Sequence, residues 1–387
     1  MPAVSERAAL LLLCRVLSEN PSIRASAVAV LSEENLRAAV IALARTERIL
    51  PALHAAISHF PDGVPRSDRI PLAIAYEANR RRNQQIRNAV IELAAEADRH
   101  SIEIVVLKGA RWAMEDSVNF AAWRSMLDLD VLVRPGDYEA MPGILAQLGY
   151  RSTRRERNFL GQRRFTGHYH LPAHRRADQP FTVEIHRHIG FQPALLPTER
   201  IFDSSRLVGP GLRLPSPADA ALHAIIHWRI HHFGTQFGFH RVTDGIDIAR
   251  FLHRDDVKWD VLPGHAGSTG IRPELDAALG TVSELFLAPL PPGVQLSQQA
   301  RNYVSKALRP RESRLLAWKA KQHQRIERLW HDHRFLYRMQ LREAGPAVTR
   351  LGLWGLRIRR LPFAVSHLIS IALLQTAILI RRGVRSS

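Results

Sequence analysis

Apolar side chains recur with a helical period over most of the chain and with a strand period in one central stretch. The helical spacing predicts amphipathic helices at residues 5–18, 32–58, 71–100, 138–148, 217–228, 242–253 and 312–343. Pro51 can start a new helix inside the second of these segments. Short β-branched runs and period-two alternation predict strands at residues 104–107, 127–133 and 181–186.

Strands interleaved with helices indicate an α/β or α+β sheet domain over residues 99–190, with a hairpin at residues 151–171 and later loops that include residues 262–269. For the whole chain we predict an α+β fold, in which a small mixed β-sheet core is flanked by helical N-terminal and C-terminal regions. This interpretation divides the chain into a helical N-terminal region, the core, a helical lid and a basic helical tail, at residues 1–98, 99–200, 201–300 and 301–387.

The net charge of +18 on this 387-residue chain is concentrated at one end. From Arg301 onward there are 19 Lys and Arg against 4 Asp and Glu, whereas the first 300 residues hold 35 against 32. A basic tail on a nearly neutral body indicates an anionic partner for the tail, either a membrane surface or a nucleic acid. The single cysteine, Cys14, excludes an internal disulfide and fits a reducing compartment, so we expect a cytoplasmic protein.

The last apolar segment, residues 361–380, contains 20 residues without a formal charge and is flanked by arginines. Its length just reaches the thickness of a bilayer core. Pro362, His367 and Gln375 weaken it as a spanning helix, and the flanking arginines fit a helix that lies in the membrane interface. Three alternatives stay open: an interfacial helix at the inner face of the membrane, a spanning helix, or a helix packed on the body or on a second copy.

Acidic residues in the central strands point to a metal site. Asp128 and Asp130 alternate with apolar residues, so both carboxylates lie on one face of the sheet. Two acids on one face of an apolar strand are costly unless a cation lies between them, and a divalent metal is the usual solution. Glu184 lies on a later strand and shares a face with His186. Asp128, Asp130 and Glu184 therefore form the predicted metal-ligand set.

Lys108 and Gly109 form a turn between the first strand and a short helix. Backbone N–H groups at such a turn, with the Lys108 ammonium beside them, make a place for a phosphate. The alternative is that Lys108 is a charge at the edge of the strand without any role in phosphate binding. Arg124 can clamp a phosphate, or it can pair with the acids and hold them apart when metal is absent.

These motifs, LKG at residues 107–109, Arg124, and DLDVLV at residues 128–133, resemble the nucleotidyltransferases of the DNA polymerase β superfamily. Within it, residues 34–252 are most similar to the bacterial uncharacterised nucleotidyltransferase family. The resemblance implies a two-metal Mg²⁺ site with Asp128 and Asp130 as ligands. It implies that Glu184 is the third acid, acting as a ligand or as the base for the incoming hydroxyl.

The same resemblance assigns nucleotide-binding roles. Lys108 and Gly109 would meet the triphosphate, although Ala110 stands where the wider superfamily has a serine that contacts phosphate. Arg124 and His186 match a family arginine and histidine, and His186 would contact substrate or support the metal ligands.

Three histidines, His223, His227 and His231, are spaced by four and would stack along one face of a helix. That spacing can bind zinc, but no acidic or cysteine ligand is clustered with them. We expect instead a helical lid whose histidines, His227 among them, face the nucleotide. Asp247 matches a family aspartate and is expected to anchor this lid to Arg241 or Arg250. The block of His168, Tyr169 and His170, together with His174, is expected on the surface of the hairpin.

The predicted function is Mg²⁺-dependent transfer of NMP from an NTP to an unidentified acceptor, in a polysaccharide or peptide-modification pathway. The alternative is a non-catalytic, nucleotide-binding accessory protein that attaches to an anionic membrane surface through its tail. A nucleic-acid-directed transferase is a third hypothesis that only the charge of the tail favours.

Overall fold

The structure is a computed structural model that describes residues 4–60, 62–153, 169–190, 192–231, 241–292 and 294–307. The predicted basic helix at residues 312–343 and the apolar segment at residues 361–380 lie outside these ranges, as does most of the predicted hairpin. Within the described part of the chain, no helix is both long and apolar enough to cross a membrane.

A seven-stranded mixed sheet with flanking helices confirms the predicted α+β fold. The strand order is β3-β4-β5-β2-β1-β7-β6, in which β2 runs parallel to β5 and antiparallel to β1. The three predicted strands are β1 (Ile104–Val106), β2 (Asp128–Leu132) and β5 (Thr182–His186). A further strand, β3 (Arg151–Ser152), lies at the start of the predicted hairpin. The sequence does not predict β4 (His174–Arg175), β6 (Arg206–Gly209) or β7 (Leu212–Leu214).

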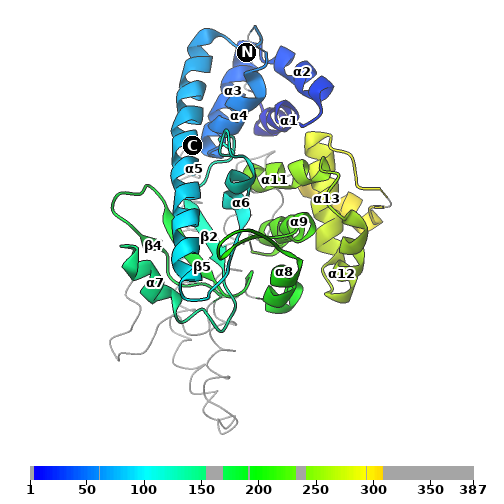
Figure 1. Cartoon of the computed structure of the whole chain (residues 1–387). Helices are drawn as coiled ribbons and strands as arrows, with labels where there is room; N and C mark the ends of the chain where they lie inside the picture. The colour runs from blue at the N-terminus through cyan, green and yellow to red at the C-terminus, as the bar shows by residue number, and fades with distance from the viewer. Residues whose placement is uncertain are drawn as a thin grey trace, which may run out of the picture. The chain divides into compact units, whose positions relative to one another are not determined.

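Alternation along β2 gives the sheet two different faces. Leu129 and Val131 belong to one core with side chains of α5 (Arg66–Asp98) and α7 (Met141–Gln147). The long helix α5 lies along this face (Figure 1). Leu132 belongs to a second core with side chains of α8 (Thr198–Ser204) and α9 (Pro217–Ile226). Because Asp128 and Asp130 alternate with the first pair, they point to the α9 side.

The described residues 4–60 contain four helices, one more than the spacing of apolar residues and Pro51 predict. The additional helix is α2, whose start at Asn20-Pro21 is marked by an N-cap side chain and a proline in the first turn. The predicted helix at residues 32–58 is two helices separated at Arg48, which adopts a left-handed φ of 59°. The four helices are α1 (Glu6–Val16), α2 (Pro21–Val30), α3 (Glu34–Thr46) and α4 (Leu50–Ile57).

Further helices follow the strands. The structure contains α6 (Lys108–Glu115) after β1, and later a π-helical turn η2 (His227–His231), α11 (Val242–Leu252), α12 (Leu262–Ser268), α13 (Arg272–Phe286) and α14 (Gln298–Ala307). Short 3-10 turns lie at η1 (Pro193–Leu195) and η3 (Trp259–Val261). The prediction of a loop at residues 262–269 is wrong, because α12 is stabilised by burial of Leu262 and Ala266 despite two glycines of low helix propensity.

The predicted hairpin is also corrected at its far end. β3 pairs in antiparallel register with β4, so Ser152 lies opposite His174, beyond the predicted end at residue 171. His174 is 3% exposed, and its Nδ1 lies 2.8 Å from the Pro172 carbonyl oxygen. The expectation that His174 is on the surface is therefore wrong, because β4 also pairs with β5 and brings His174 into the sheet.

Two buried asparagines of α5 hold the loop that precedes β2. Asn79 Nδ2 donates to the carbonyls of Ala122 and Arg124, at 2.7 and 2.9 Å. Asn83 Nδ2 donates to the carbonyls of Ala121 and Arg124, at 2.9 and 3.0 Å. Ala121 has a left-handed φ of 47°, a conformation that is costly for a residue with a Cβ. The asparagines therefore fix a strained loop that leads directly into the acidic strand.

We predict that Asn83→Ala lowers the free energy of unfolding by about 1–3 kcal/mol, because two buried carbonyl groups lose a donor. Chemical denaturation followed by circular dichroism measures the change. The matched control is Gln84→Ala on the exposed face of the same helix, which we expect to stay within about 0.5 kcal/mol of the wild type. Equal stability of the two variants would contradict the role given to Asn83.

Candidate active site

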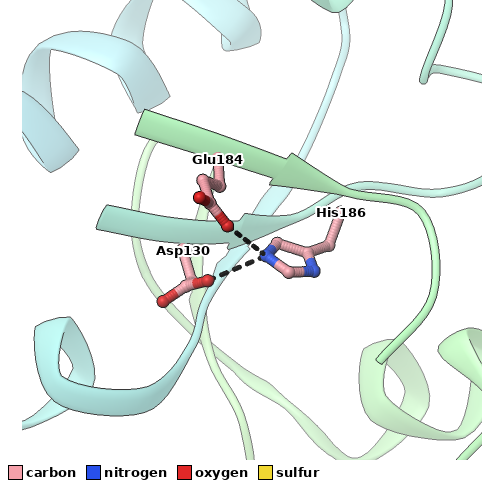
Figure 2. A group of neighbouring side chains, drawn as sticks. All are labelled: Asp130, Glu184 and His186. Atoms are coloured by element: carbon pink, nitrogen blue, oxygen red, sulfur yellow. Dashed lines mark hydrogen bonds and ion pairs between the residues drawn. The ribbon is translucent and has the colours of Figure 1, made fainter. Parts of the chain in front are cut away.

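The parallel register of β2 and β5 brings the acidic residues together. Asp130 lies opposite Glu184, and Leu132 lies opposite His186. The side chains of Asp130, Glu184 and His186 converge on one face of these two strands (Figure 2). His186 Nε2 lies 2.8 Å from Asp130 Oδ1 and 3.9 Å from Glu184 Oε2. One potential ligand atom from each of the three residues lies within 4.8 Å of the others.

Asp130 is the most deeply buried member of this cluster, at 1% exposure. Lys108 Nζ donates to Asp130 Oδ1 at 2.7 Å, and His186 contacts the same oxygen. Burial alone would raise the pKa of Asp130, but Lys108 and His186 outweigh it and hold that pKa well below its usual range. Burial would likewise lower the pKa of Lys108, but the carboxylates of Asp130, Asp128 and Glu184 raise it. Asp130 and Lys108 therefore form a charged pair at neutral pH.

Asp128 differs from the other predicted ligands in its surroundings. It lies at the exposed start of β2, opposite Thr182 of β5. The negative charge of Asp130 raises the pKa of Asp128. The predicted ligand set was Asp128, Asp130 and Glu184, whereas the tightest cluster contains His186 in place of Asp128. Two carboxylates and an imidazole are donors that fit a divalent cation, and Asp128 adds a third carboxylate at the open end of the same face.

Lys108 and Gly109, predicted as a turn before a short helix, are the first two residues of that helix, α6. The Leu107 N–H donates to the Asp130 carbonyl at 3.0 Å, which sets the end of β1 against β2. Lys108 then takes a left-handed φ of 47°, and this bend turns its side chain to Asp130. A Cβ added to Gly109 would lie 2.7 Å from Met126 Cγ, so glycine permits close packing of α6 on the loop before β2.

Arg124 is held by Asp247 of α11 rather than by the acids of β2. Its Nε donates to both carboxylate oxygens of Asp247 at 3.0 Å, and its Nη2 donates to Oδ2 at 2.8 Å. Nη1 donates to the Ser125 carbonyl at 2.9 Å. Burial alone would lower the pKa of Arg124, but Asp247 raises it. The expected pairing of Asp247 with Arg241 or Arg250 is thus corrected, because α11 meets the loop before β2 through this buried ion pair.

A cleft lies between α6, α9 and α11, with an empty volume of about 530 Å³ that is partly open to solvent. Lys108 lines this cleft and also contacts Asp130, so the cleft adjoins the acidic cluster. His227 lines it as predicted for a lid histidine, with its Nδ1 3.8 Å from Asp244 Oδ2. The other lining residues are Leu107, Arg111, Trp112, Arg124, Ile201, Pro215, Asp219, Ala220, His223, Ala224, Asp244, Asp247 and Phe251.

Tyr169 and His170 lie near His186, a position that the sequence does not predict. The rings of Tyr169 and His170 lie 5.7 and 5.2 Å from the His186 ring, and His170 forms an antiparallel bridge with His186. They were assigned to the hairpin surface, because nothing in their local sequence shows that the chain returns to β5 there. The hypothesis that His223, His227 and His231 bind zinc stays untested, because the structure does not describe the side chain of His231.

A family model described as "uncharacterised nucleotidyltransferase" matches residues 34–287, about two-thirds of the chain. This chain belongs to that nucleotidyltransferase family. The match includes the acidic cluster, the turn at Lys108, the Arg124–Asp247 pair and the whole lining of the cleft. No curated protein and no solved structure matches this nucleotidyltransferase.

We predict that Asp247→Ala destabilises the nucleotidyltransferase by about 3–5 kcal/mol, because the buried charge of Arg124 loses its partner. The double variant Arg124→Met/Asp247→Leu removes both charges and should lose less stability than the single variant. Chemical denaturation of both proteins and of Asp255→Ala, an exposed control just after α11, gives the comparison. A single variant as stable as the Asp255→Ala control would contradict this account of the pair.

Proposed function

We propose that this nucleotidyltransferase is metal-dependent and transfers NMP from an NTP to a hydroxyl or phosphate of an acceptor. The observation that carries the proposal is the convergence of Asp130, Glu184 and His186 from two parallel strands, beside Lys108 and an adjoining cleft. An acidic cluster beside a cleft whose lining includes Lys108 and Arg111 suits the binding of metal and polyphosphate. The aspartates of the lining, Asp219 and Asp247, pair with Arg200 and Arg124.

Asp128, Asp130 and Glu184 would hold the metal, with His186 beside them as a further donor. The donor set fits Mg²⁺ through its three carboxylates, and the site is expected to take two ions. When bound, divalent ions would draw charge from the attacking and leaving oxygens of the displacement. The buried position of Asp130 supports this role, since a buried carboxylate has its position fixed by the surrounding strands.

The proposed reaction is an in-line displacement at the α-phosphorus of the NTP. The acceptor oxygen forms a bond to this phosphorus, the bond from the phosphorus to the bridging β-phosphate oxygen breaks, and pyrophosphate leaves with that electron pair. The acceptor proton passes to the carboxylate of Glu184, whose side chain is 25% exposed and so open to an acceptor. Asp130 is too buried for that exchange.

The nucleotide would lie along the cleft, with Lys108 and the N–H groups near Gly109 at its triphosphate. His227 would contact the nucleotide from the lid. Arg124 would help to order this wall of the cleft, and the ion pair with Asp247 supports a positioning role. Ala110 carries no hydroxyl, so backbone groups and Lys108 take over the phosphate contacts that a serine would make.

The acceptor is proposed to belong to polysaccharide synthesis or peptide modification. The enzyme is further proposed to be a member of the DNA polymerase β superfamily and to act in the cytoplasm. The basic tail, residues 301–387, would bring the enzyme to an anionic membrane surface. We also propose that the chain is divided into four parts, namely a helical N-terminal region (1–98), a catalytic core (99–200), a lid (201–300) and this tail.

We predict that calorimetric titration of the four NTPs gives saturable, Mg²⁺-dependent binding to the wild type and at least a tenfold loss of affinity in Asp128→Asn/Asp130→Asn. The loss follows because the neutral amides cannot replace carboxylates as ligands of a divalent ion. Asp178→Asn, which changes an exposed acid in the loop before β5, is the control and should bind as the wild type does.

Unchanged Mg²⁺–NTP affinity in the double variant would overturn the metal assignment. If the protein binds NTP but forms no labelled product with any of a broad set of acceptor hydroxyls and phosphates, the non-catalytic, nucleotide-binding alternative is favoured instead. A salt-dependent loss of nucleic-acid binding would be required of the nucleic-acid-directed hypothesis.

A further inference from the structure

Arg111 is a buried cation in the wall of the cleft whose donors are only partly used. It lies on α6, one turn after Lys108, and is 2% exposed. Its Nη2 donates to Glu115 Oε1 at 2.9 Å. Within the residues that the structure describes, its Nε and Nη1 are buried and have no hydrogen-bond partner. A buried N–H without a partner costs about 1–3 kcal/mol, so such donors in a cleft indicate a ligand.

Arg124 shows what a purely structural arginine looks like in the same cleft. All three of its nitrogens donate to Asp247 or to the Ser125 carbonyl, so each nitrogen has a partner within the protein. Arg111 makes a single such contact, although a guanidinium has five N–H donors. The difference between the two arginines lies in their partners rather than in their burial.

The surroundings of Arg111 leave it with excess positive charge. Its one carboxylate, Glu115, is shared, because Arg254 Nη1 donates to Glu115 Oε2 at 2.9 Å and Arg206 lies 3.9 Å from Oε1. Asp256 pairs with Arg254, so this group of residues holds three arginines and two acids. Burial lowers the pKa of Arg111 to about 10, which still leaves it charged at neutral pH.

Apolar groups complete the site. The Arg111 guanidinium carbon lies 5.1 Å from the Trp112 ring centroid and 5.3 Å from the Phe251 ring centroid. Both rings line the cleft with Leu107 and Pro215. The rings keep the guanidinium in place and leave little water beside it, which strengthens its interaction with an anion. The three aspartates that also line the cleft have cationic neighbours, since Asp219 pairs with Arg200, Asp247 pairs with Arg124, and Asp244 lies 3.8 Å from Arg241. An organic molecule that carries an anionic group would therefore match Arg111 and its two rings.

We propose that Arg111 forms an anion subsite in this cleft, separate from the candidate metal ligands, and that it binds a phosphate group of a substrate through the N–H groups that Glu115 leaves unused. The proposal rests on the proposed function only for the identity of the molecule that carries the phosphate. That molecule is either the nucleotide, bound through its terminal phosphate, or a phosphorylated acceptor.

The test is calorimetric titration of the full chain with inorganic phosphate, in EDTA and without nucleotide. We expect saturable binding to the wild type and at least a tenfold weaker affinity in Arg111→Met. Arg134→Met is the matched control, because Arg134 also pairs with a glutamate and contacts an aromatic ring but does not line the cleft, and it should bind phosphate as the wild type does. Since no metal or NTP is present, this result does not depend on transferase activity.

Arg111→Lys guards against a failure of Arg111→Met to fold, because it keeps the charge beside Glu115 but lacks the planar set of donors. It should unfold at the wild-type temperature and bind phosphate at least threefold more weakly. Equal phosphate affinity in the wild type and in a folded Arg111 variant would overturn the proposal, and so would a wild type that binds no phosphate.

Competition then identifies the source of the phosphate. If inorganic phosphate competes with Mg²⁺–NTP but not with the corresponding NMP, the subsite takes the terminal phosphate of the nucleotide. If phosphate still binds at saturating NTP, and the Arg111 variants still weaken this binding by the same factor, the subsite takes a phosphorylated acceptor. Both results support the Arg111 subsite. If phosphate competes with Mg²⁺–NTP equally well in the wild type and in Arg111→Lys, phosphate binds elsewhere and the proposal is overturned.

Discussion

A buried carboxylate needs cations beside it, and Asp130 sets this requirement for the whole site. Its position in the middle of β2 puts it against β1 on one side and β5 on the other. The end of β1 meets the requirement with Lys108, and His186 of β5 makes a 2.8 Å contact with the same carboxylate oxygen. The left-handed backbone at Lys108 is the local cost of that arrangement, of the order of 1 kcal/mol. The residues that follow β1 and the neighbouring strand β5 thus supply the partners that Asp130 lacks within its own strand.

A second buried ion pair, Arg124 with Asp247, extends this order from the sheet to the lid. The loop before β2 is held by hydrogen bonds from two asparagines of α5 and by the ion pair of Arg124 with Asp247 of α11. Asp128 and Asp130 follow this loop directly, so their placement depends on helices on both sides of the sheet. In the adjoining cleft, Nε and Nη1 of Arg111 have no hydrogen-bond partner among the described residues, whereas all three side-chain nitrogens of Arg124 have one.

The parts of this site that follow from local sequence could be predicted, and those that depend on long-range pairing could not. Period-two alternation identified the acidic face of β2 and the Glu184–His186 face of β5, because each depends on neighbours in one strand. The partner of Asp247 lies 123 residues away in the chain, and no periodicity points to it. His174 and the short strands β6 and β7 were missed for the same reason, since a strand of two to four residues carries too little pattern. The unused donors of Arg111 are visible only when its surroundings are known.

The second hydrophobic core has a consequence for how the chain becomes folded. It contains side chains of α1 to α4 together with those of α9, α11 and α13, which follow in the sequence only after the sheet. The earliest helices to leave the ribosome therefore cannot complete their burial until α13 has been made. A nascent chain would carry exposed apolar surface for most of its synthesis, with contacts of high sequence separation formed last. Folding of this enzyme is thus a late event, set by the arrival of α13 rather than by its N-terminal helices.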